Sequence, residues 1–437
     1  MRLVIWHTDP FPTAPGVYLG CFPGMGHEVT WVVSDTNGRN EILERREGGV
    51  RHFEVRRRQD SLLPPPIGVL VNRWNKLITF FLKARLMDRL AREQPDVLQV
   101  RDLVIEGLLA LWAARRHGVR FAYQLDHPHF EARLMELDLG ERGRALERLW
   151  MRLWMALRRV VLRGADLVFP ISLGMGELLR DREGVDPRRM VPFPVGVSRS
   201  TFDRGGSGAV DPRAAGLADS PTVCYLGNLE ARRDPGLIFG VFDEVGRRVP
   251  ESRFLVVGRW SDLVRDRLRD LSFVEHLQFV PFVPHDEVPA LLRAARVGVF
   301  PLALDDPYGV YRSSSPLKVV EYMSAGLPVV ASRVRDAEDA LGLSGGGVCV
   351  ENDPAAFAQA MEGYLRDPDR ARRDGARGRA WVETHRLFEV LARDVEAAYR
   401  RLIETGVPAC PESPLLPASR PSAAATADAP RGSRGPR

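Results

Sequence analysis

The hydrophobic positions along the chain alternate between short apolar runs and longer amphipathic stretches. Short apolar strands separated by helices are typical of βαβ units, in which a parallel sheet is covered by helices on both faces. The first 170 residues follow this pattern, with strand-like runs at residues 3–6, 27–33, 95–100, 121–124 and 165–170 and helix-like stretches at 77–92 and 105–116. They therefore predict a doubly wound α/β domain.

A second series of the same kind begins after residues 196–220, which are rich in glycine, alanine, serine and aspartate. Its predicted strands are residues 222–226, 253–257, 297–301 and 328–332, and its predicted helices are 235–247 and 316–325. We expect two doubly wound Rossmann-like domains facing across a cleft, which is the natural ligand site. The expected boundaries are 1–200 for the first domain, 201–220 for a linker, 221–405 for the second domain with a last helix that can cross back, and 406–437 for a disordered tail.

The composition is that of a soluble globular protein, with 45% hydrophobic and 27% charged residues in 437. No apolar run reaches the roughly 18–20 residues that span a bilayer, and the N-terminus does not resemble a secretion signal. Cys21, Cys224, Cys349 and Cys410 lie far apart and form no metal-ligand spacing. We expect a cytoplasmic protein with no metal site and no cofactor.

Basic residues are mainly arginine, because only Lys76, Lys83 and Lys318 are lysines among 62 basic residues. Such a bias reflects genome composition more than binding to nucleic acid, and the chain shows no nucleic-acid-binding module. We therefore expect no nucleic-acid partner. The bias also makes each lysine informative about a specific role.

The helix predicted after residue 315 is the strongest candidate for a binding site. Ser315 is a good N-cap and Pro316 suits the first helical position, while Gly326 and Pro328 suit its end. Because a strand precedes this helix, we expect its N-terminus, at Ser315 and Leu317, to lie at the carboxyl edge of the sheet. Backbone N–H groups and the helix dipole favour a phosphate there.

Lys318 and Glu321 are three residues apart and share one face of that helix. The lysine can meet a phosphate, and the glutamate can accept two hydrogen bonds from a diol such as a ribose. The alternative is a capped surface helix that carries an ion pair. The rarity of lysine in this chain favours the binding interpretation.

The loop after residues 222–226 is a second candidate. Gly227 lets the backbone turn at the end of the strand, and Arg232 and Arg233 precede the next helix. Arginine binds phosphate oxygens with two bonds at once, so either arginine can converge with Lys318 on one diphosphate. Solvated arginines are the alternative.

Together these segments resemble the nucleotide-sugar-binding half of a GT-B glycosyltransferase of family 4. The resemblance rests on residues 225–227, 254–258, 276–284 and above all 315–332, and in the first half on 26–29, 95–97, 165–168 and 196–202. It implies that the second domain holds a nucleotide-diphosphate sugar and the first presents the acceptor. It further implies that Glu321 holds the ribose, that Arg232, Arg233 and Lys318 hold the diphosphate, and that transfer proceeds with retention and without an obligatory metal.

The chain departs from the family pattern at three places. Ser313 stands where the family often has a glutamate, Asn228 where it often has an arginine, and Pro15-Gly16 where the acceptor-side loop is often Gly-Gly. These departures leave open a different grip on the diphosphate or a different donor.

Asp126 and His127 follow the predicted strand 121–124 and are the candidate catalytic residues. Relatives often carry His or Asp at this place, facing the transferred sugar, and such groups can orient the acceptor or polarise the reacting centre. A loop with local hydrogen bonds is an equal alternative. His7 and Asp9, after the first strand, are weaker candidates of the same kind.

The segment from Arg142 to Arg163 predicts an amphipathic helix. At about 100° per residue its arginines, among them Arg144, Arg148 and Arg152, share one face and its leucines and tryptophans the other. We expect this apolar face to pack on the sheet with the arginines in water. Peripheral contact with an anionic membrane through the arginines is compatible with that packing and would place the protein at the inner face of the plasma membrane.

The function predicted from the sequence is retaining transfer of a sugar to a glycan or lipid-linked acceptor, in the synthesis of cell-surface polysaccharide or glycolipid. A nucleotide-sugar epimerase or hydrolase on the same fold is one alternative. A catalytically silent binding protein is another, because Ser313 and Asn228 depart from the family.

Overall fold

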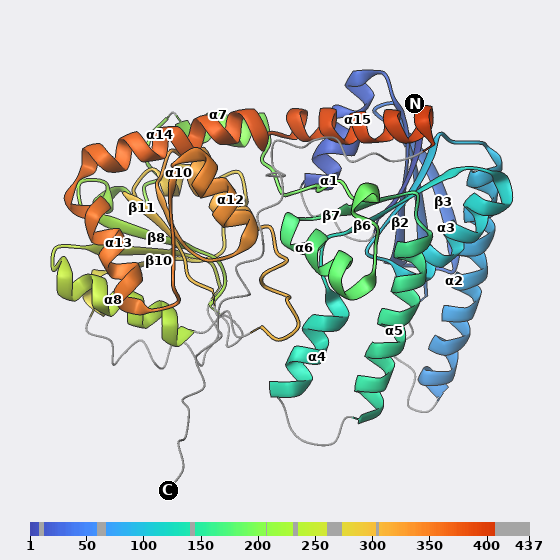
Figure 1. The fold of residues 1–437 in the computed structure, drawn as a ribbon, viewed down its shortest axis with the longest axis horizontal. Coiled ribbons are helices and arrows are strands. Elements are labelled where there is room, and N and C mark those ends of the chain that lie inside the picture. The colour runs from blue at the N-terminus through green and yellow to red at the C-terminus, as the bar shows by residue number, and fades with distance from the viewer. Residues whose placement is uncertain are drawn as a thin grey trace, which may run out of the picture.

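Two sheets form the two halves of the molecule. The computed structural model describes residues 1–7, 13–58, 67–139, 145–206, 208–229, 235–259, 273–302 and 306–406. These residues contain a seven-stranded sheet of order β3-β4-β2-β1-β5-β6-β7 and a six-stranded sheet of order β10-β9-β8-β11-β12-β13. The sheets lie beside each other, each with its own helices (Figure 1). The predicted fold class is confirmed.

The first sheet contains β1 (Arg2–His7), β2 (Glu28–Asn37), β3 (Glu41–Glu47), β4 (Val50–Arg57), β5 (Val97–Arg101), β6 (Arg120–Leu125) and β7 (Leu167–Pro170). Its neighbouring strands are parallel, except that β3 and β4 form an antiparallel hairpin. The sequence analysis missed this hairpin. Strand β3 lies at the sheet edge and is half-buried or exposed along its length, so it lacks the apolar run that marks the other strands.

Alternate residues of β1 face two different helical layers, as the period of a strand requires. Val4 and Trp6 belong to the core formed with α2 (Ile67–Arg92), α3 (Val104–His117) and α5 (Ala145–Gly164). Leu3 and Ile5 belong to the core formed with the π-helical segment η1 (Gly16–Cys21) and α15 (Phe388–Thr405). The last described helix thus covers the first sheet, as Figure 1 shows at its upper edge. The remaining helical elements of this half are α1 (Thr13–Pro15), η2 (Pro23–Met25), α4 (His129–Leu139), α6 (Leu173–Leu178), η3 (Leu179–Glu183) and η4 (Pro187–Arg189).

The second sheet consists of parallel pairs between β10 (Leu277–Val280), β9 (Arg253–Val257), β8 (Thr222–Leu226), β11 (Val297–Phe300), β12 (Val329–Ser332) and β13 (Gly347–Val350). Its helices are α8 (Pro235–Arg248), α10 (Val288–Leu292), α11 (Leu317–Ser324), α12 (Arg335–Ser344), α13 (Pro354–Arg366) and α14 (Pro368–His385). Two 3-10 turns, η5 (Ala215–Leu217) and η7 (Val274–His276), complete this half. Helix α7 (Arg199–Gly206) lies partly in the predicted linker and packs against α10 and α11. The predicted disordered tail, from 407 onward, lies outside the described residues.

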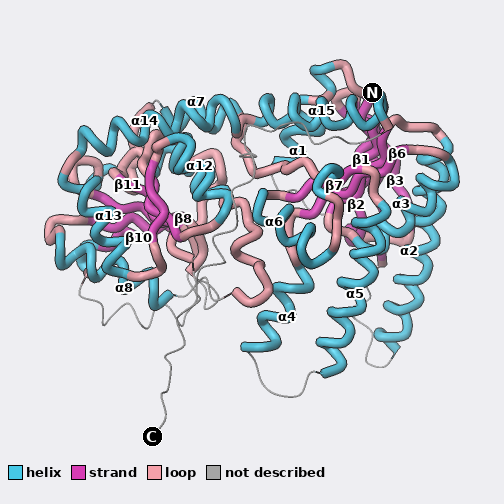
Figure 2. Tube along the Cα trace, viewed as in Figure 1, coloured by secondary structure: helices cyan, strands magenta, loops and turns pink. Residues whose placement is uncertain are grey.

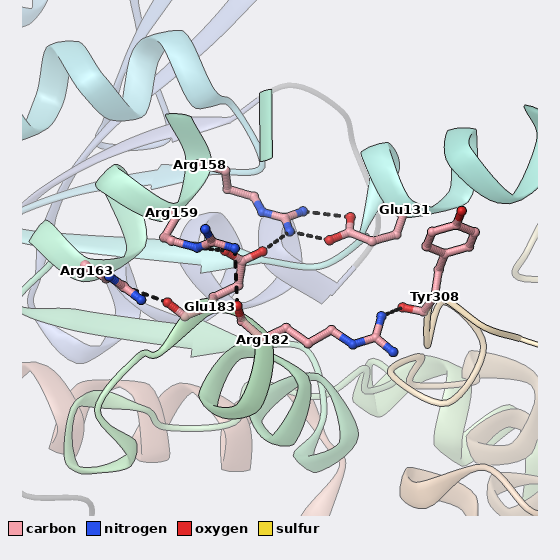
Figure 3. A network of polar contacts seen from close by, with 7 residues as sticks. All are labelled: Glu131, Arg158, Arg159, Arg163, Arg182, Glu183 and Tyr308. Carbon is pink, nitrogen blue, oxygen red and sulfur yellow. Dashed lines mark hydrogen bonds and ion pairs between the residues drawn. The ribbon is translucent and has the colours of Figure 1, made fainter. Parts of the chain in front are cut away.

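Helix α5 corrects one expectation. Its apolar side chains Leu146, Leu149, Trp150 and Leu153 are exposed, whereas they were expected to pack on the sheet. Arg158 turns inward, because Glu131 and Glu183 bind it, whereas Arg159 and Arg163 bind Glu183 from a half-buried and an exposed position (Figure 3). The expected packing of the apolar face is therefore wrong in the first half of α5, whereas Arg152 and Arg163 of the predicted arginine face are exposed as expected; Arg142 and Arg144 lie outside the described residues.

Candidate active site

A cleft of about 1280 Å³ lies between the two halves and is lined by both. Its walls are formed by loops that follow the carboxyl ends of strands β5 and β6 on one side and β8, β9 and β11 on the other, where parallel α/β sheets bind ligands. Predicted site residues from both walls line it, namely Asp126, His127, Gly227, Ser315, Leu317, Lys318 and Glu321. We call the wall of the second half the donor wall and that of the first half the acceptor wall.

Two glycines let the loops of the donor wall approach one another. Gly227 follows β8 with φ +133°, and a Cβ there would lie 2.5 Å from Lys318 Nζ. Gly258 follows β9 with φ +154°, and its Cβ would lie 2.2 Å from the Gly227 oxygen. A side chain at Gly258 would clash with the backbone, and one at Gly227 would displace the end of the Lys318 side chain. L residues also rarely adopt these φ values. The loop after β8 thus lies beside Lys318 at Gly227.

Helix α11 is held against the sheet by Tyr322. The backbone N–H of Leu226 donates to the Tyr322 hydroxyl at 2.6 Å, and this hydroxyl donates to the Val299 carbonyl at 3.3 Å. A Cβ at Gly298 would lie 2.4 Å from the tyrosine ring, so the ring fills the space that this glycine leaves. These contacts fix α11 across the ends of β8 and β11, with its N-terminus at the cleft.

Ser315 does not cap α11 as predicted. Pro316 is the N-cap residue, and no side chain caps the helix. The Ser315 hydroxyl donates to Asp336 Oδ2 at 2.7 Å and accepts from the Val195 N–H at 3.2 Å. Asp336 in turn accepts from Arg386 at 2.8 Å. Ser315 therefore joins the turn before α11 to the chain that connects the two halves.

Glu321 is buried in the donor wall and faces the cleft. Burial raises the pKa of its carboxyl group to about 8, although Lys318 acts in the opposite direction. His285 Nε2 lies 3.1 Å from Glu321 Oε1, and burial lowers the pKa of this histidine. Burial thus favours the neutral form of both groups. The sequence analysis missed His285, which lies in a loop beyond β10.

Lys318 Nζ lies over two aromatic rings, 5.1 Å from the centroid of Tyr225 and 5.4 Å from that of Phe300. Such contacts hold an ammonium group near the cleft without neutralising it. Asn228 lines the cleft, and its side-chain oxygen accepts from the Arg259 N–H at 3.1 Å. Ser313 is buried, with its hydroxyl donating to the Val310 carbonyl at 3.1 Å. Arg232 and Arg233 lie outside the described residues.

Arg101 is the centre of the acceptor wall. Its Nε lies 2.5 Å from Asp126 Oδ2 and 3.6 Å from Asp102 Oδ2, and its Nη1 is hydrogen-bonded to His7 Nε2. Burial raises the pKa of both carboxyl groups, against the effect of Arg101. Burial followed by Arg101 lowers the pKa of His7 to about 3, so this weaker candidate is neutral and serves as a partner of Arg101.

Asp102 supports the loop that carries the two candidate catalytic residues. Its Oδ1 accepts from the N–H groups of Asp126 at 2.8 Å and His127 at 3.4 Å. Asp102 has φ +58°, a conformation that among L residues Asn and Asp tolerate best. His127 is exposed and makes an edge contact with the His129 ring, with centroids 4.6 Å apart. Sequence analysis missed Arg101 and Asp102, although both directly follow a predicted strand.

Gly16 does not line the cleft. It begins η1, and a Cβ there would lie 2.3 Å from the ring of Phe388 in α15. This glycine therefore allows α15 to pack on the first half, which differs from its expected role in an acceptor-side loop. Asp9 lies outside the described residues.

Comparison with known families agrees with both halves of the fold. The family described as "Glycosyl transferases group 1" matches residues 220–367, and "Glycosyl transferase 4-like domain" matches residues 19–196. The chain belongs to family 4 of the GT-B glycosyltransferases. The family predicted from residues 315–332 and their companions is confirmed.

Individual members of this family and fold resemble the chain at modest identity. A GDP-mannose-dependent alpha-(1-6)-phosphatidylinositol monomannoside mannosyltransferase of Mycolicibacterium smegmatis is 29% identical over 202 residues, which are 46% of this chain and half the length of that relative. A D-inositol 3-phosphate glycosyltransferase of Frankia alni is 28% identical over 318 residues, 68% of this chain and 72% of that one. Among solved structures, sucrose-phosphate synthase from Thermosynechococcus elongatus superposes with a TM-score of 0.66 at 16% identity, over 93% of this chain and 100% of that chain. The structural likeness shows the fold.

Proposed function

We propose that this protein is a retaining glycosyltransferase that moves a sugar from a nucleotide-diphosphate sugar to a lipid-linked or glycan acceptor in the synthesis of cell-surface glycolipid or polysaccharide. The observation that carries the proposal is the position of Glu321. This carboxyl group is buried, faces the cleft one turn into α11, and lies on the same wall as Lys318 and the two close glycine turns.

The donor wall suits a nucleoside diphosphate. A carboxylate can accept two hydrogen bonds from the ribose diol, and such charge-assisted bonds are stronger than neutral ones. Lys318 and the N-terminus of α11 offer positive charge to the diphosphate, which gains charge as the sugar leaves. We place the diphosphate over Gly227, where the absence of a Cβ leaves the backbone accessible.

The acceptor wall suits a hydroxyl nucleophile held by polar groups. We assign Asp126 and His127 to the acceptor and the transferred sugar, because they line the cleft opposite α11. Arg101 and Asp102 fix the position of Asp126 through its carboxylate and its backbone N–H, respectively. During transfer the bond between the anomeric carbon and the diphosphate oxygen breaks, and a bond to the acceptor oxygen forms on the same face of the sugar.

Two relatives support an acceptor that contains a phosphorylated inositol, since one is named for phosphatidylinositol monomannoside and the other for D-inositol 3-phosphate. We favour the lipid-linked form for this chain. The wide separation of its cysteines also favours work in the reducing cytoplasm, where nucleotide sugars are available.

A thermal-shift panel of nucleoside diphosphates and their sugars tests the donor assignment. A ligand at about a hundred times its dissociation constant should stabilise the protein by about 2.7 kcal/mol. Glu321→Ala should abolish that shift, and an unchanged shift would remove Glu321 from the site.

Incubation of the shifted donor with candidate acceptors then tests the reaction. Product that retains the anomeric configuration supports transfer. Release of free sugar without acceptor would favour a hydrolase, and donor binding without any turnover would favour a binding protein.

A further inference from the structure

Helices α2 and α5, which both pack against α3, carry most of the exposed large apolar side chains in the described residues. Within α2 and α5 these are Val69, Leu70, Trp74, Leu77, Phe80, Phe81, Leu146, Leu149, Trp150, Leu153 and Val160. All but Val160 lie in residues 67–81 of α2 or residues 145–154 of α5. We refer to these two ranges as the first halves of the helices and to the ten residues as the projecting apolar surface. Contiguous exposed apolar patches of this kind mark interaction sites.

Helix α2 changes character half-way along its length. In its second half the inward residues are apolar, such as Leu86 and Leu90, and the outward residues are Arg85, Arg89 and Arg92. This is the ordinary arrangement for a helix that covers a sheet in water.

The first half of α2 has the opposite arrangement. Its outward residues include Trp74 and Phe81, which are 62% and 63% exposed, whereas Asn75 and Thr79 are buried. Asn75 accepts from Asn40 at 2.7 Å and donates to the Arg58 carbonyl at 3.2 Å, so the polar side of this half is already satisfied within the protein. Its apolar side faces outward.

Helix α5 shows the same reversal. Leu146 and Trp150 are 83% and 54% exposed, while Arg158 is buried and bonded to Glu131 and Glu183. Figure 3 shows Arg158 directed toward both glutamates and Arg159 toward Glu183. Because these bonds fix Arg158 inward, the opposite side of the helix, with Leu149 and Leu153, faces outward.

Both first halves extend beyond the sheet. Helix α2 has 26 residues, which gives a length of about 39 Å, whereas a five-residue strand spans about 17 Å. Both helices lead by their C-terminal ends into the start of a strand, so their first halves project past the carboxyl edge that borders the cleft. Figures 1 and 2 show the first halves of α2 and α5 projecting on the same side of the molecule, together with α4. Helix α4 begins at His129, which lines the cleft.

We propose that the projecting apolar surface inserts into the interfacial layer of an anionic lipid membrane. Its two tryptophans have the amphipathic rings that favour the level of lipid headgroups. Arg73, Lys76 and Arg152 are exposed on the same helix halves, and such basic residues bind anionic headgroups. Within the described residues no helix has the length and hydrophobicity needed to cross a bilayer, so the contact is peripheral.

The purpose of this membrane contact rests on the proposed function, transfer of a sugar to a lipid-linked acceptor. A membrane held at this edge would bring the headgroup of a lipid-linked acceptor to the side of the cleft where Asp126 and His127 lie. The contact uses the apolar face of α5 together with Arg152, whereas the sequence suggested a contact through the arginines alone.

Vesicle flotation of the full chain tests the proposal. Vesicles of phosphatidylcholine with 30% phosphatidylglycerol are compared with vesicles of pure phosphatidylcholine. The protein should bind the anionic vesicles at least tenfold more strongly. Trp74→Ser with Phe81→Ser, and separately Leu149→Ser with Trp150→Ser, should each weaken this binding more than tenfold, whereas Val274→Ser with Leu343→Ser, exposed apolar positions of the second half, should leave it unchanged.

Charge variants form a second, matched test on one helix. Arg73→Gln with Lys76→Gln should weaken binding to the anionic vesicles by roughly fivefold for each charge. Arg85→Gln with Arg92→Gln removes the same charge from the half of α2 that covers the sheet, and should have no more than a twofold effect. These exposed positions keep the fold intact even where an apolar variant fails to fold.

Three outcomes would overturn the inference. The protein would stay free of anionic vesicles, or the control variants would lose as much binding as the test variants. Alternatively, analytical ultracentrifugation would show that the wild-type protein is a dimer and that the Trp74 and Trp150 variants are monomers. The surface would then be an interface between two copies. The donor-induced thermal shift is measured in parallel and should not change in any of these variants. If the wild-type protein lacks that shift yet floats with vesicles, the proposed function fails while the membrane contact stands.

Discussion

The two walls of the cleft differ in whether their buried carboxyl groups have a cationic partner in direct contact. In the donor wall, Glu321 is buried beside a neutral histidine, and its pKa is raised to about 8. In the acceptor wall, Arg101 lies between Asp126 and Asp102 and is bonded to His7. The acceptor wall therefore offsets part of its buried negative charge with Arg101, although burial still raises the pKa of Asp102 and Asp126. The donor wall holds an acid whose ionised form is disfavoured until a ligand arrives.

This difference indicates that Glu321 serves ligand binding, whereas Arg101 serves the stability of the fold. A buried acid that lacks a strong cationic partner destabilises the empty protein at neutral pH, and binding sites commonly contain such groups. A buried cation between two carboxylates is needed by the fold itself, because removing it leaves uncompensated charge. Removal of the Glu321 charge and removal of the Arg101 charge should therefore change stability in opposite directions.

The largest effect is expected for Glu321→Gln. Loss of two charge-assisted hydrogen bonds to the ribose, each worth about 1.5–3 kcal/mol, should weaken donor binding more than a hundredfold. The same change should stabilise the empty protein at pH 7.5 by about 2–4 kcal/mol. Between the unfolded pKa of Glu321, about 4.5, and its folded pKa, about 8, each pH unit costs the wild-type protein about 1.4 kcal/mol of stability, and glutamine removes this cost. Calorimetry of donor binding and denaturant unfolding measure the two effects.

The matched control for Glu321→Gln is Asp126→Asn, the same change in the acceptor wall. It should keep donor affinity within about threefold and lower the rate of transfer by about a hundredfold or more. If Glu321→Gln instead destabilises the empty protein, the carboxylate is stabilised by contacts other than those described, and the comparison between the walls fails.

Arg101→Gln should destabilise the protein by about 3–5 kcal/mol, because it leaves Asp102 and Asp126 buried without their cation. Lys318→Gln is the corresponding change in the donor wall. Since Lys318 is only half-buried, its loss should change the stability of the empty protein by less than about 1 kcal/mol while weakening donor binding about tenfold. Equal losses of stability in urea unfolding would contradict the assignment of Arg101 to the fold and Lys318 to the ligand.

The donor wall was the easier wall to predict from sequence. Gly227, Lys318 and Glu321 lie within or beside a strand, a turn and a short helix, and this local pattern predicts where they are placed. All three line the cleft. The fold was predictable for the same reason, because apolar runs and helix periods are local. Ser315 shows the limit of this reasoning, since its hydroxyl bonds to Asp336 and Val195, partners that no local pattern reveals.

The acceptor wall depends on contacts between strands far apart in the chain. His7, Arg101 and Asp126 come from three adjacent strands, so their joint arrangement exists only after the sheet forms. Helix α5 shows the same limit for orientation. Its periodicity defined two faces, but the bonds of Arg158 to Glu131 and Glu183, which no local pattern reveals, turn this arginine inward and leave the apolar face of the first half exposed.

Donor affinity should depend on pH through Glu321 alone among the residues of the donor wall. The ribose diol binds the ionised carboxylate, so binding below pH 8 must release a proton. Affinity should therefore be highest above the pKa of about 8 and fall by up to about tenfold per unit as the pH drops below it. Titration calorimetry with an intact nucleotide sugar between pH 6 and 9 measures this slope, and Glu321→Gln should give a flat profile. A slope that persists in that variant would assign the titration to another group, such as His285.

The smallest effect is expected for Asp102→Asn, which tests whether the acceptor wall acts as one unit. Asparagine tolerates the left-handed backbone at φ +58° and keeps an oxygen that accepts from the N–H groups of Asp126 and His127. It removes the like charge that, after burial, raises the pKa of Asp126, together with the carboxylate that lies 3.6 Å from Arg101. The acidic limb of the pH–rate profile for transfer should therefore move to lower pH by less than about one unit, with donor affinity unchanged. Asp102→Ala removes the accepting oxygen as well and should lower the rate about tenfold. If the limb stays in place in Asp102→Asn, the ionisation that limits transfer belongs to a residue other than Asp126.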